Sequence, residues 1–157
     1  ILTIGGIPLL YLGDEIGTLN DYRYRDDPDK ARDSRWVHRP QADWERYERR
    51  SDPKTIEGRV FQGLQALIRL RKTYSAFEGT QMEVIDMGNE HLLGFVRAHA
   101  GERAVSFANF SEQEQPVEAR ILEQYNCTSM MVVHGDSRLV KNKLTLRPLD
   151  FLIFHSA

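Results

Sequence analysis

An apolar run that ends in two adjacent carboxylates constrains the fold of this chain more than any other feature. Residues 6–12 read GIPLLYL, and Gly13, Asp14 and Glu15 follow at once. Pro8 lacks a backbone donor and restricts where a strand can begin, while Gly13 lets the backbone turn where the apolar residues stop. Because the apolar residues do not alternate with polar ones, we expect a strand covered on both faces, as in parallel sheets.

A parallel strand needs parallel neighbours, and no second run of this kind occurs downstream. The sequence also opens on Ile1 rather than on an initiator Met. We therefore expect the sheet partners of this strand to precede residue 1, and the chain to be the C-terminal piece of a larger protein.

Composition narrows the class of protein. The 157 residues are 41% apolar with a formal charge of -2, which fits a globular chain and gives no reason to expect a nucleic-acid partner. The chain contains no run of about 20 apolar residues, so no membrane span is predicted, and no signal segment is visible. The lone Cys127 excludes an internal disulfide and fits a reducing compartment, so we expect a cytoplasmic protein that needs no membrane.

Residues 13–50 carry charges of both signs among several large aromatic residues, which predicts a long, ordered connection rather than a disordered one. A short helix is predicted over 41–50, because Trp44 and Tyr47 lie three residues apart. Asp52 and Pro53 then predict the start of a helix that runs to about Lys72. Its apolar positions recur at helical spacing: Ile56, Val60, Phe61, Leu64, Leu67 and Ile68, with Arg71. Strand, loop and helix together predict one βα unit over 1–77.

From Gly79 the apolar period changes to about two, which predicts short strands. The candidate strands are 82–87, 91–99, 103–110, 115–121, 129–133, 143–147 and 151–155, separated by turn signals such as Gly88-Asn89 and Gly135-Asp136. Regularly spaced short strands of this kind predict an antiparallel β-sandwich over 78–157.

Residues 6–17 resemble the eighth strand and following loop of the (β/α)8 TIM-barrel enzymes of the α-amylase superfamily, in which a Gly-Ile-Pro-apolar-Tyr-apolar-Gly-Asp-Glu run is characteristic. The continuation at 18–21 (TLND) and 33–40 (DSRWVHRP) resembles more narrowly the amylosucrases and the similar sucrose hydrolases. Residues 109–111 (NFS) resemble the first hairpin of the C-terminal β-domain of that superfamily. The resemblance implies that 1–77 holds strand 8, loop 8 and helix 8 of a barrel.

This resemblance implies a retaining parent enzyme that cleaves sucrose, releases fructose and passes glucose to an α-1,4-glucan without a cofactor. The catalytic Asp, Glu and Asp of the family follow strands four, five and seven, all before Ile1, so we expect no catalytic residue in this chain and no activity of it alone. Asp14 and Glu15 are not the catalytic pair, because neighbours at the end of one strand point in different directions. A sucrose hydrolase, another α-amylase-family glucosidase, and a non-catalytic carbohydrate-binding or structural β module are the alternatives. A homo-oligomer also stays open.

Arg35 is the sharpest candidate for shaping a substrate pocket, because a guanidinium binds a carboxylate at two points. In amylosucrases, the Arg at the matching Ser-Arg-Trp position pairs with an Asp of an early loop and closes the glucosyl subsite. The alternative is a surface ion pair with Asp33 or Asp29, worth about 0–1 kcal/mol. Since the early-loop Asp is missing here, we expect Arg35 to be mobile or paired differently.

The other candidates each have a structural alternative. Asp14 and Glu15 either form the floor of a sugar site or cap the loop through backbone N–H groups. Trp36, together with Trp44, Tyr22 and Tyr24, either stacks on sugar rings or packs the loop, and we favour packing. Asp21 belongs to the TLND motif of the candidate pocket.

No metal site is predicted. The acidic run at 26–29 lacks the ligand spacing and the central Gly of an EF-hand loop, so a solvated, salt-bridged loop is favoured. His91, His99, His134 and His155 have no metal-ligand spacing, and His38 is expected to hydrogen-bond within the loop. Arg69, Arg71 and Lys72 are interpreted as a basic end of the long helix.

Overall fold

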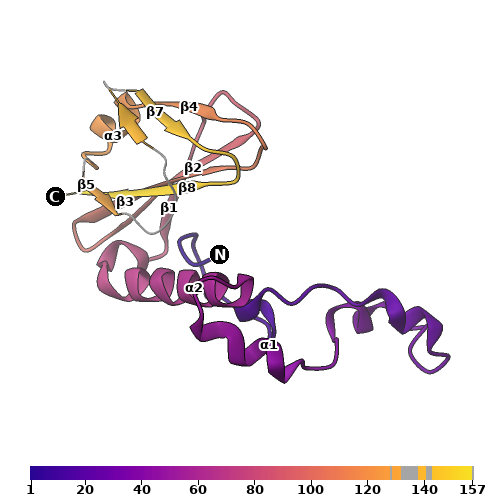
Figure 1. Cartoon of the computed structure of the whole chain (residues 1–157). Coiled ribbons are helices and arrows are strands. Elements are labelled where there is room, and N and C mark those ends of the chain that lie inside the picture. Colours follow the sequence, from indigo (N-terminus) through magenta and orange to yellow (C-terminus); the bar gives the residue numbers. More distant parts are fainter. Residues whose placement is uncertain (128, 132–137, 141–142, 157) are drawn as a thin grey trace. The chain divides into compact units, whose positions relative to one another are not determined.

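The computed structural model describes residues 1–127, 129–131, 138–140 and 143–156 (Figure 1). The chain forms two compact units. The first contains Ile1–Pro8 and Ala66–Ala157, and the second contains Leu9–Gln65.

The first unit is built on two antiparallel sheets, as the spacing of short strands predicts. The larger sheet has the strand order β1-β2-β3-β8-β5, with bounds Gln81–Ile85, Leu92–His99, Glu102–Asn109, Phe151–His155 and Ser129–Met131. The smaller sheet has the order β4-β7-β6, with bounds Gln115–Glu118, Lys143–Leu146 and Arg138–Val140. Every strand pair within the described residues is antiparallel.

The core of this unit lies between the two sheets. Val105 and Phe107 of β3 and Phe154 of β8 cluster there with Leu144 and Leu146 of β7, all at most 1% exposed. The Phe107 and Phe154 rings meet edge to face with centroids 6.3 Å apart. Apolar side chains of two sheets that share one core define a β-sandwich, which confirms the antiparallel fold predicted for this region.

The chain between β4 and β5 departs from the prediction. A strand was expected over 115–121, but β4 ends at Glu118 and the helix α3 (Arg120–Gln124) follows. The last pair of the ladder among the described residues joins Glu118 to Lys143, the first residue of β7. The predicted strand over 129–133 is present at 129–131, while residues 132–133, His134 and the Gly135-Asp136 turn lie outside the described residues.

The long helix α2 (Ile56–Thr73) contributes residues to both units and begins later than predicted. Asp52 does not cap it, since its carboxylate accepts from Lys54 N at 2.9 Å in a turn before the helix. Thr55 is the cap, because its Oγ1 accepts from Gly58 N at 3.0 Å. Gly58 is also required sterically: a Cβ there would lie 1.9 Å from the Asp52 carbonyl oxygen. This close approach explains why a glycine occupies this position within the helix.

The end of α2 packs on the outer face of the larger sheet. Leu70 and the buried Ala76 and Phe77 of the 3₁₀ turn η5 (Ser75–Phe77) cluster there with Ala104 and Ile153. The larger sheet is therefore covered on both faces, by the smaller sheet and by this helix end.

Two arginines hold the first residues of the chain to this unit, and the sequence pattern did not reveal this. Arg71 donates to the carbonyls of Leu2 at 2.8 Å and Gly6 at 2.9 Å, rather than only ending a helix. Arg97, in the middle of β2, is fully buried. Its guanidinium donates to the carbonyls of Thr3, Phe77, Gly79 and Gln81. Desolvation by burial lowers the pKa of Arg97, with a smaller contribution from the nearby charge of Arg71.

The buried strand predicted over residues 7–12 is absent. Ile7 is 98% exposed, Leu9 79% and Leu12 74%, and the segment forms no strand. Among the described residues no strand lies beside it, so its backbone has no ladder to join. The apolar pattern was identified correctly, but the strand prediction is wrong for this chain.

The second unit is a succession of short helical turns. They are η1 (Asp14–Ile16), η2 (Tyr22–Asp26), η3 (Ser34–His38), α1 (Trp44–Glu48) and η4 (Arg49–Ser51). Asp21, Asp33 and Asp43 each cap one of these turns by accepting a backbone N–H two or three residues ahead. The helix predicted over 41–50 is thus α1, shortened at its start by the Asp43 cap, with η4 continuing from it.

Candidate functional site

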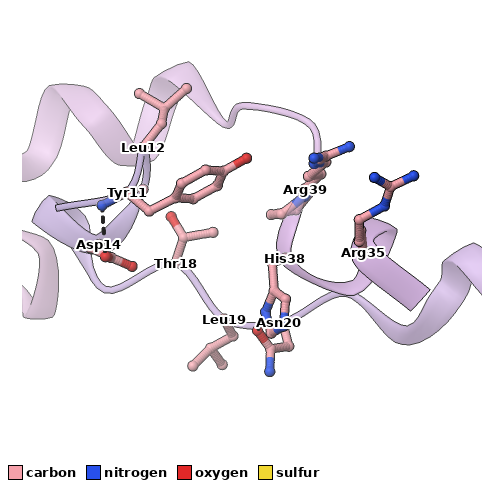
Figure 2. Close-up of a pocket in the computed structure, with 11 residues that line it drawn as sticks. Tyr11, Leu12, Asp14, Thr18, Leu19, Asn20, Arg35, His38 and Arg39 are labelled. Atoms are coloured by element: carbon pink, nitrogen blue, oxygen red, sulfur yellow. Dashed lines mark hydrogen bonds between the residues drawn. The ribbon is translucent and has the colours of Figure 1, made fainter. Parts of the chain in front are cut away.

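A pocket of about 370 Å³ lies within the second unit (Figure 2). It is lined by residues 11–14, 18–20, 35 and 38–40. The pocket therefore unites the end of the GIPLLYLGDE run with parts of the TLND and DSRWVHRP segments. Of the predicted site residues, Asp14 and Arg35 line it, whereas Glu15, Asp21 and Trp36 do not.

Asp14 and Glu15 serve the backbone around them. Asp14 Oδ2 accepts from Tyr11 N at 3.0 Å (Figure 2). Glu15 Oε2 accepts from Gly13 N at 2.7 Å. Gly13 has φ 103°, and a Cβ on it would lie 2.9 Å from Thr18 Oγ1, so only glycine fits this turn. These bonds agree with the capping alternative for both carboxylates.

Arg35 forms a two-point ion pair with Asp33. Arg35 Nε donates to Oδ1 at 2.8 Å and its terminal NH2 nitrogen to Oδ2 at 2.8 Å, while Arg35 N donates to Oδ1 at 3.0 Å. These bonds lower the pKa of Asp33 to about 2, chiefly through the guanidinium. The Arg35 side chain is nevertheless 74% exposed. The geometry agrees with the expectation that Arg35 pairs differently here, and Asp33 is the partner.

The same local arrangement occurs a second time in the loop. Asp21 accepts from Arg23 N at 3.0 Å, from Arg23 Nε at 2.9 Å and from its NH2 nitrogen at 2.7 Å. The pKa of Asp21 is also lowered to about 2 by that guanidinium. An Asp that caps a turn and binds the Arg two residues later is therefore a local feature of this sequence. Arg23 provides a natural comparison for Arg35, because it does not line the 370 Å³ pocket.

Two contacts connect the segments on either side of the pocket. The His38 ring Nδ1 and Asn20 Oδ1 lie 3.0 Å apart, and Asp21 N donates to Val37 O at 2.9 Å. The hydrogen-bonding role expected for His38 is thus present, with Asn20 as its partner. Asn20, His38 and Arg39 line the pocket but were not among the predicted site residues (Figure 2). The sequence signal that could have identified them is their position inside the TLND and DSRWVHRP segments.

The loop aromatics pack against neighbouring loop residues, as the favoured alternative expects. The Lys30 ammonium lies 5.4 Å from the centroid of the Trp36 ring, and Arg25 lies over the rings of Tyr22 and Tyr24. The Trp44 and Tyr47 rings are 5.4 Å apart.

A largely buried ion pair joins Arg46 and Glu57 within the second unit. Arg46 Nε donates to Glu57 Oε1 at 2.7 Å, and Arg46 also donates to the carbonyls of Ile16 and Gly17 at 3.3 Å. The guanidinium lowers the pKa of Glu57. This contact ties α1 and η1 to the first turn of α2.

Lys30 forms an ion pair with Asp27 at 2.7 Å, in agreement with the salt-bridged interpretation of the acidic run. In the part of the chain that the structure describes, no three His, Cys, Asp or Glu side chains gather as metal ligands. No helix within that part is both long and apolar enough to cross a membrane.

No family model matches this chain. Its fold is similar to that of trehalose-6-phosphate hydrolase from Bacillus licheniformis, with a TM-score of 0.69 and 18% identity over 99% of this chain and 37% of that one. It is similar also to cyclic alpha-maltosyl-(1→6)-maltose hydrolase from Arthrobacter globiformis, with a TM-score of 0.67 and 18% identity over 99% of this chain and 28% of that one. Trehalulose synthase MutB from Pseudomonas mesoacidophila matches with a TM-score of 0.51 and 16% identity over 70% of this chain and 19% of that one.

These solved proteins, two hydrolases and a synthase by name, are enzymes of the α-amylase family, and the structure of the MutB E254Q mutant holds its substrate sucrose. This chain spans between about a fifth and two fifths of their length. At such identities the likeness defines a shared fold.

Proposed function

We propose that this chain is the C-terminal part of a retaining enzyme of the amylosucrase type, which moves glucose from sucrose to an α-1,4-glucan and releases fructose. The pocket carries the proposal, because the two segments that resemble amylosucrases, residues 18–21 and 33–40, both contribute to its lining, beside Asp14 of the run that resembles the wider superfamily. Residues 1–77 would contribute the last strand, loop and helix of the barrel, and residues 78–157 a stabilising β-sandwich.

The fold likeness and the coverage support this proposal. The chain matches α-glucoside-acting enzymes over nearly its whole length while spanning a minor part of theirs. In a complete barrel, the exposed segment 7–12 would gain strands on both sides, which would bury Ile7, Leu9 and Leu12. The catalytic carboxylates would come from the preceding sequence.

Arg35 has a defined role in this proposal. Its guanidinium is mostly exposed and bound only by its near neighbour Asp33 among the described residues, so exchanging that partner for a carboxylate of another loop breaks a solvent-screened pair. The exchange would close one end of the glucosyl subsite and favour a disaccharide donor over a polymer.

The test is turnover of sucrose by the full-length protein that carries this chain. We expect fructose release with growth of an α-1,4-glucan. Arg35→Ala should lower kcat/KM for sucrose by about 100-fold through lost positioning of the donor. The matched variant Arg23→Ala, which breaks the equivalent local pair at a residue that does not line the 370 Å³ pocket, should stay within about threefold of the unchanged enzyme.

The products separate the alternatives. Equal amounts of glucose and fructose without glucan would identify a sucrose hydrolase. Cleavage of maltose or starch with sucrose left intact would overturn the amylosucrase proposal and leave an α-amylase-family glucosidase. If kcat/KM for sucrose falls equally in the Arg35 and Arg23 variants, Arg35 has no specific role in closing the glucosyl subsite.

A further inference from the structure

Two arginines from distant parts of the chain hold its first residues by their backbone carbonyls. The half-buried Arg71 of α2 donates to Leu2 O at 2.8 Å and to Gly6 O at 2.9 Å. The fully buried Arg97 of β2 donates to Thr3 O at 3.4 Å and to three further carbonyls of its own unit. We call these two guanidiniums, with the backbone that they hold between Leu2 and Gly6, the arginine clamp.

The arginine clamp fixes where this backbone lies. A guanidinium has its donors in a rigid planar fork, so one side chain sets the positions of several carbonyls at once. In the described part of the chain, neither Arg71 nor Arg97 forms an ion pair with a carboxylate, so these donors serve the backbone. Hydrogen bonds from a charged donor are also stronger than neutral ones. The segment from Leu2 to Gly6 is therefore held in place although it forms neither a strand nor a helix.

The clamped backbone continues directly into the pocket. Residues 11–14 line the 370 Å³ pocket, and we call them the pocket wall. Gly6, the last residue that the clamp holds, lies five positions before Tyr11. Gly6 has φ 88°, a conformation that residues with a Cβ rarely adopt, so this bend requires glycine. Because Ile7 and Leu9 between them are exposed, the covalent chain is the connection through which the clamp acts on the wall.

We propose that Arg71 and Arg97 are positioning residues for the pocket: by fixing the backbone from Leu2 to Gly6, they favour the position of the pocket wall that binds the donor sugar. This inference rests on the proposed function, because it assigns the clamp a part in sucrose binding. It also gives the β-sandwich a task in the reaction, although none of its described residues lines the 370 Å³ pocket.

A positioning role has a distinct kinetic signature. A pocket wall without its anchor samples several positions, and only some of them bind sucrose. The apparent dissociation constant rises in inverse proportion to the fraction of molecules whose wall is correctly placed. Saturating sucrose restores the correct position, so kcat stays near its original value while KM rises. Partial unfolding instead lowers kcat per total enzyme and leaves the KM of the folded molecules unchanged.

The first test is steady-state kinetics of the full-length protein with sucrose. Arg71→Met keeps the apolar stem and removes the donors, so KM should rise about tenfold with kcat within about twofold. Arg71→Lys returns one charged donor, and its KM should fall between the two. Arg69→Met, at an exposed position of the same helix, should behave as the unchanged enzyme. A fall in kcat with KM unchanged in Arg71→Met would overturn the proposal.

A second variant approaches the same contact from its acceptor side. Gly6→Ala strains the bend that presents the Gly6 carbonyl to Arg71, so it should raise KM in the same way. If both changes act through one contact, the double variant should be no worse than the more affected single variant. Fully additive effects on KM would show that Arg71 does not act through this segment.

Hydrogen exchange tests the clamp without any substrate. The backbone N–H groups of residues 7–14 should exchange at least about threefold faster in full-length Arg71→Met than in the unchanged protein or in Arg69→Met. Unchanged exchange would overturn the proposal. If the unchanged protein leaves sucrose intact, the proposed function fails, and the exchange measurement still decides whether the clamp fixes the pocket wall.

Discussion

Arg35 and Asp33 form a two-point ion pair in which Nε and a terminal nitrogen of the guanidinium each lie 2.8 Å from a carboxylate oxygen. Both residues belong to one five-residue turn and its cap, so the pair forms without help from distant parts of the chain. Because the ion pair is local, its effect on Asp33 can be measured in this chain by itself.

The first prediction concerns the titration of Asp33, whose pKa is lowered to about 2. A carboxylate with a lowered folded pKa stabilises the folded chain above its unfolded pKa, and this contribution is lost as the pH falls through about 2. Carbon NMR of the Asp33 carboxyl should show this low pKa. In Arg35→Gln the pKa should rise part of the way to its ordinary value, because the backbone N–H of residue 35 still donates. Arg39→Gln, which removes a more distant charge, should leave it low, and an unchanged pKa in Arg35→Gln would contradict the assignment.

The second prediction concerns the buried Arg97. Replacing it with Met keeps an apolar stem but removes the donors to the carbonyls of residues 3, 77, 79 and 81. Buried carbonyls without partners are unfavourable, so we expect the free energy of unfolding to fall by about 3 kcal/mol in urea titrations. Arg69→Met, at an exposed position of α2, should change it by less than about 0.5 kcal/mol. A loss as small as that of the control would show that the carbonyls find other donors.

The third prediction concerns Gly58. Alanine normally stabilises a helix relative to glycine, but here its Cβ would lie 1.9 Å from the Asp52 carbonyl oxygen. We expect Gly58→Ala to lower the free energy of unfolding by about 2 kcal/mol, because the turn before α2 must move. Gln65→Ala, exposed on the same helix, should be neutral within about 0.5 kcal/mol. Thermal unfolding of the two variants side by side measures the difference, and a stabilised Gly58→Ala would disprove the close contact.

The fourth prediction concerns the hydrogen bond of 2.6 Å that the Tyr125 hydroxyl donates to Glu83 Oε1. The Glu83 carboxylate raises the pKa of the Tyr125 phenol, because it accepts a hydrogen bond from the phenolic O–H and repels the negative charge of tyrosinate. Glu83→Gln should therefore lower that pKa toward its ordinary value, measured by ultraviolet absorbance of tyrosinate against a Tyr125→Phe reference. Glu118→Gln, at a carboxylate that pairs with Arg120 and lines one hollow together with Tyr125, should leave it unchanged. A phenol that titrates identically in Glu83→Gln would mean that the contact does not persist in solution.

Sequence reasoning identified most of the sandwich because its signal is local. Strands β2, β3 and β8 lie within about one residue of their predicted bounds, since each carries its own apolar period and turn residues. The missed helix α3 shows the limit of this reasoning. Residues 119–121 continue an acceptable strand pattern, and so short a pattern does not distinguish a strand from the short helix that forms there.

The candidate site was predicted in part. Of the predicted site residues, Asp14 and Arg35 line the 370 Å³ pocket, and their roles there stay predictions. Asn20 and His38 were missed as a linking pair, since their contact joins residues eighteen positions apart and no local rule pairs them.

The sequence by itself determined the features that depend on near neighbours. Aspartates that cap turns and a helix with one apolar face both follow from contacts within a few residues. Only the tertiary structure determined that residues 7–12 form no strand and that Arg97 is buried. A strand exists only where another strand accepts its backbone bonds, and a buried guanidinium only where distant carbonyls converge on it. The run GIPLLYLGDE therefore carries the pattern of a buried strand, while its partners, and not its own residues, decide whether it becomes one.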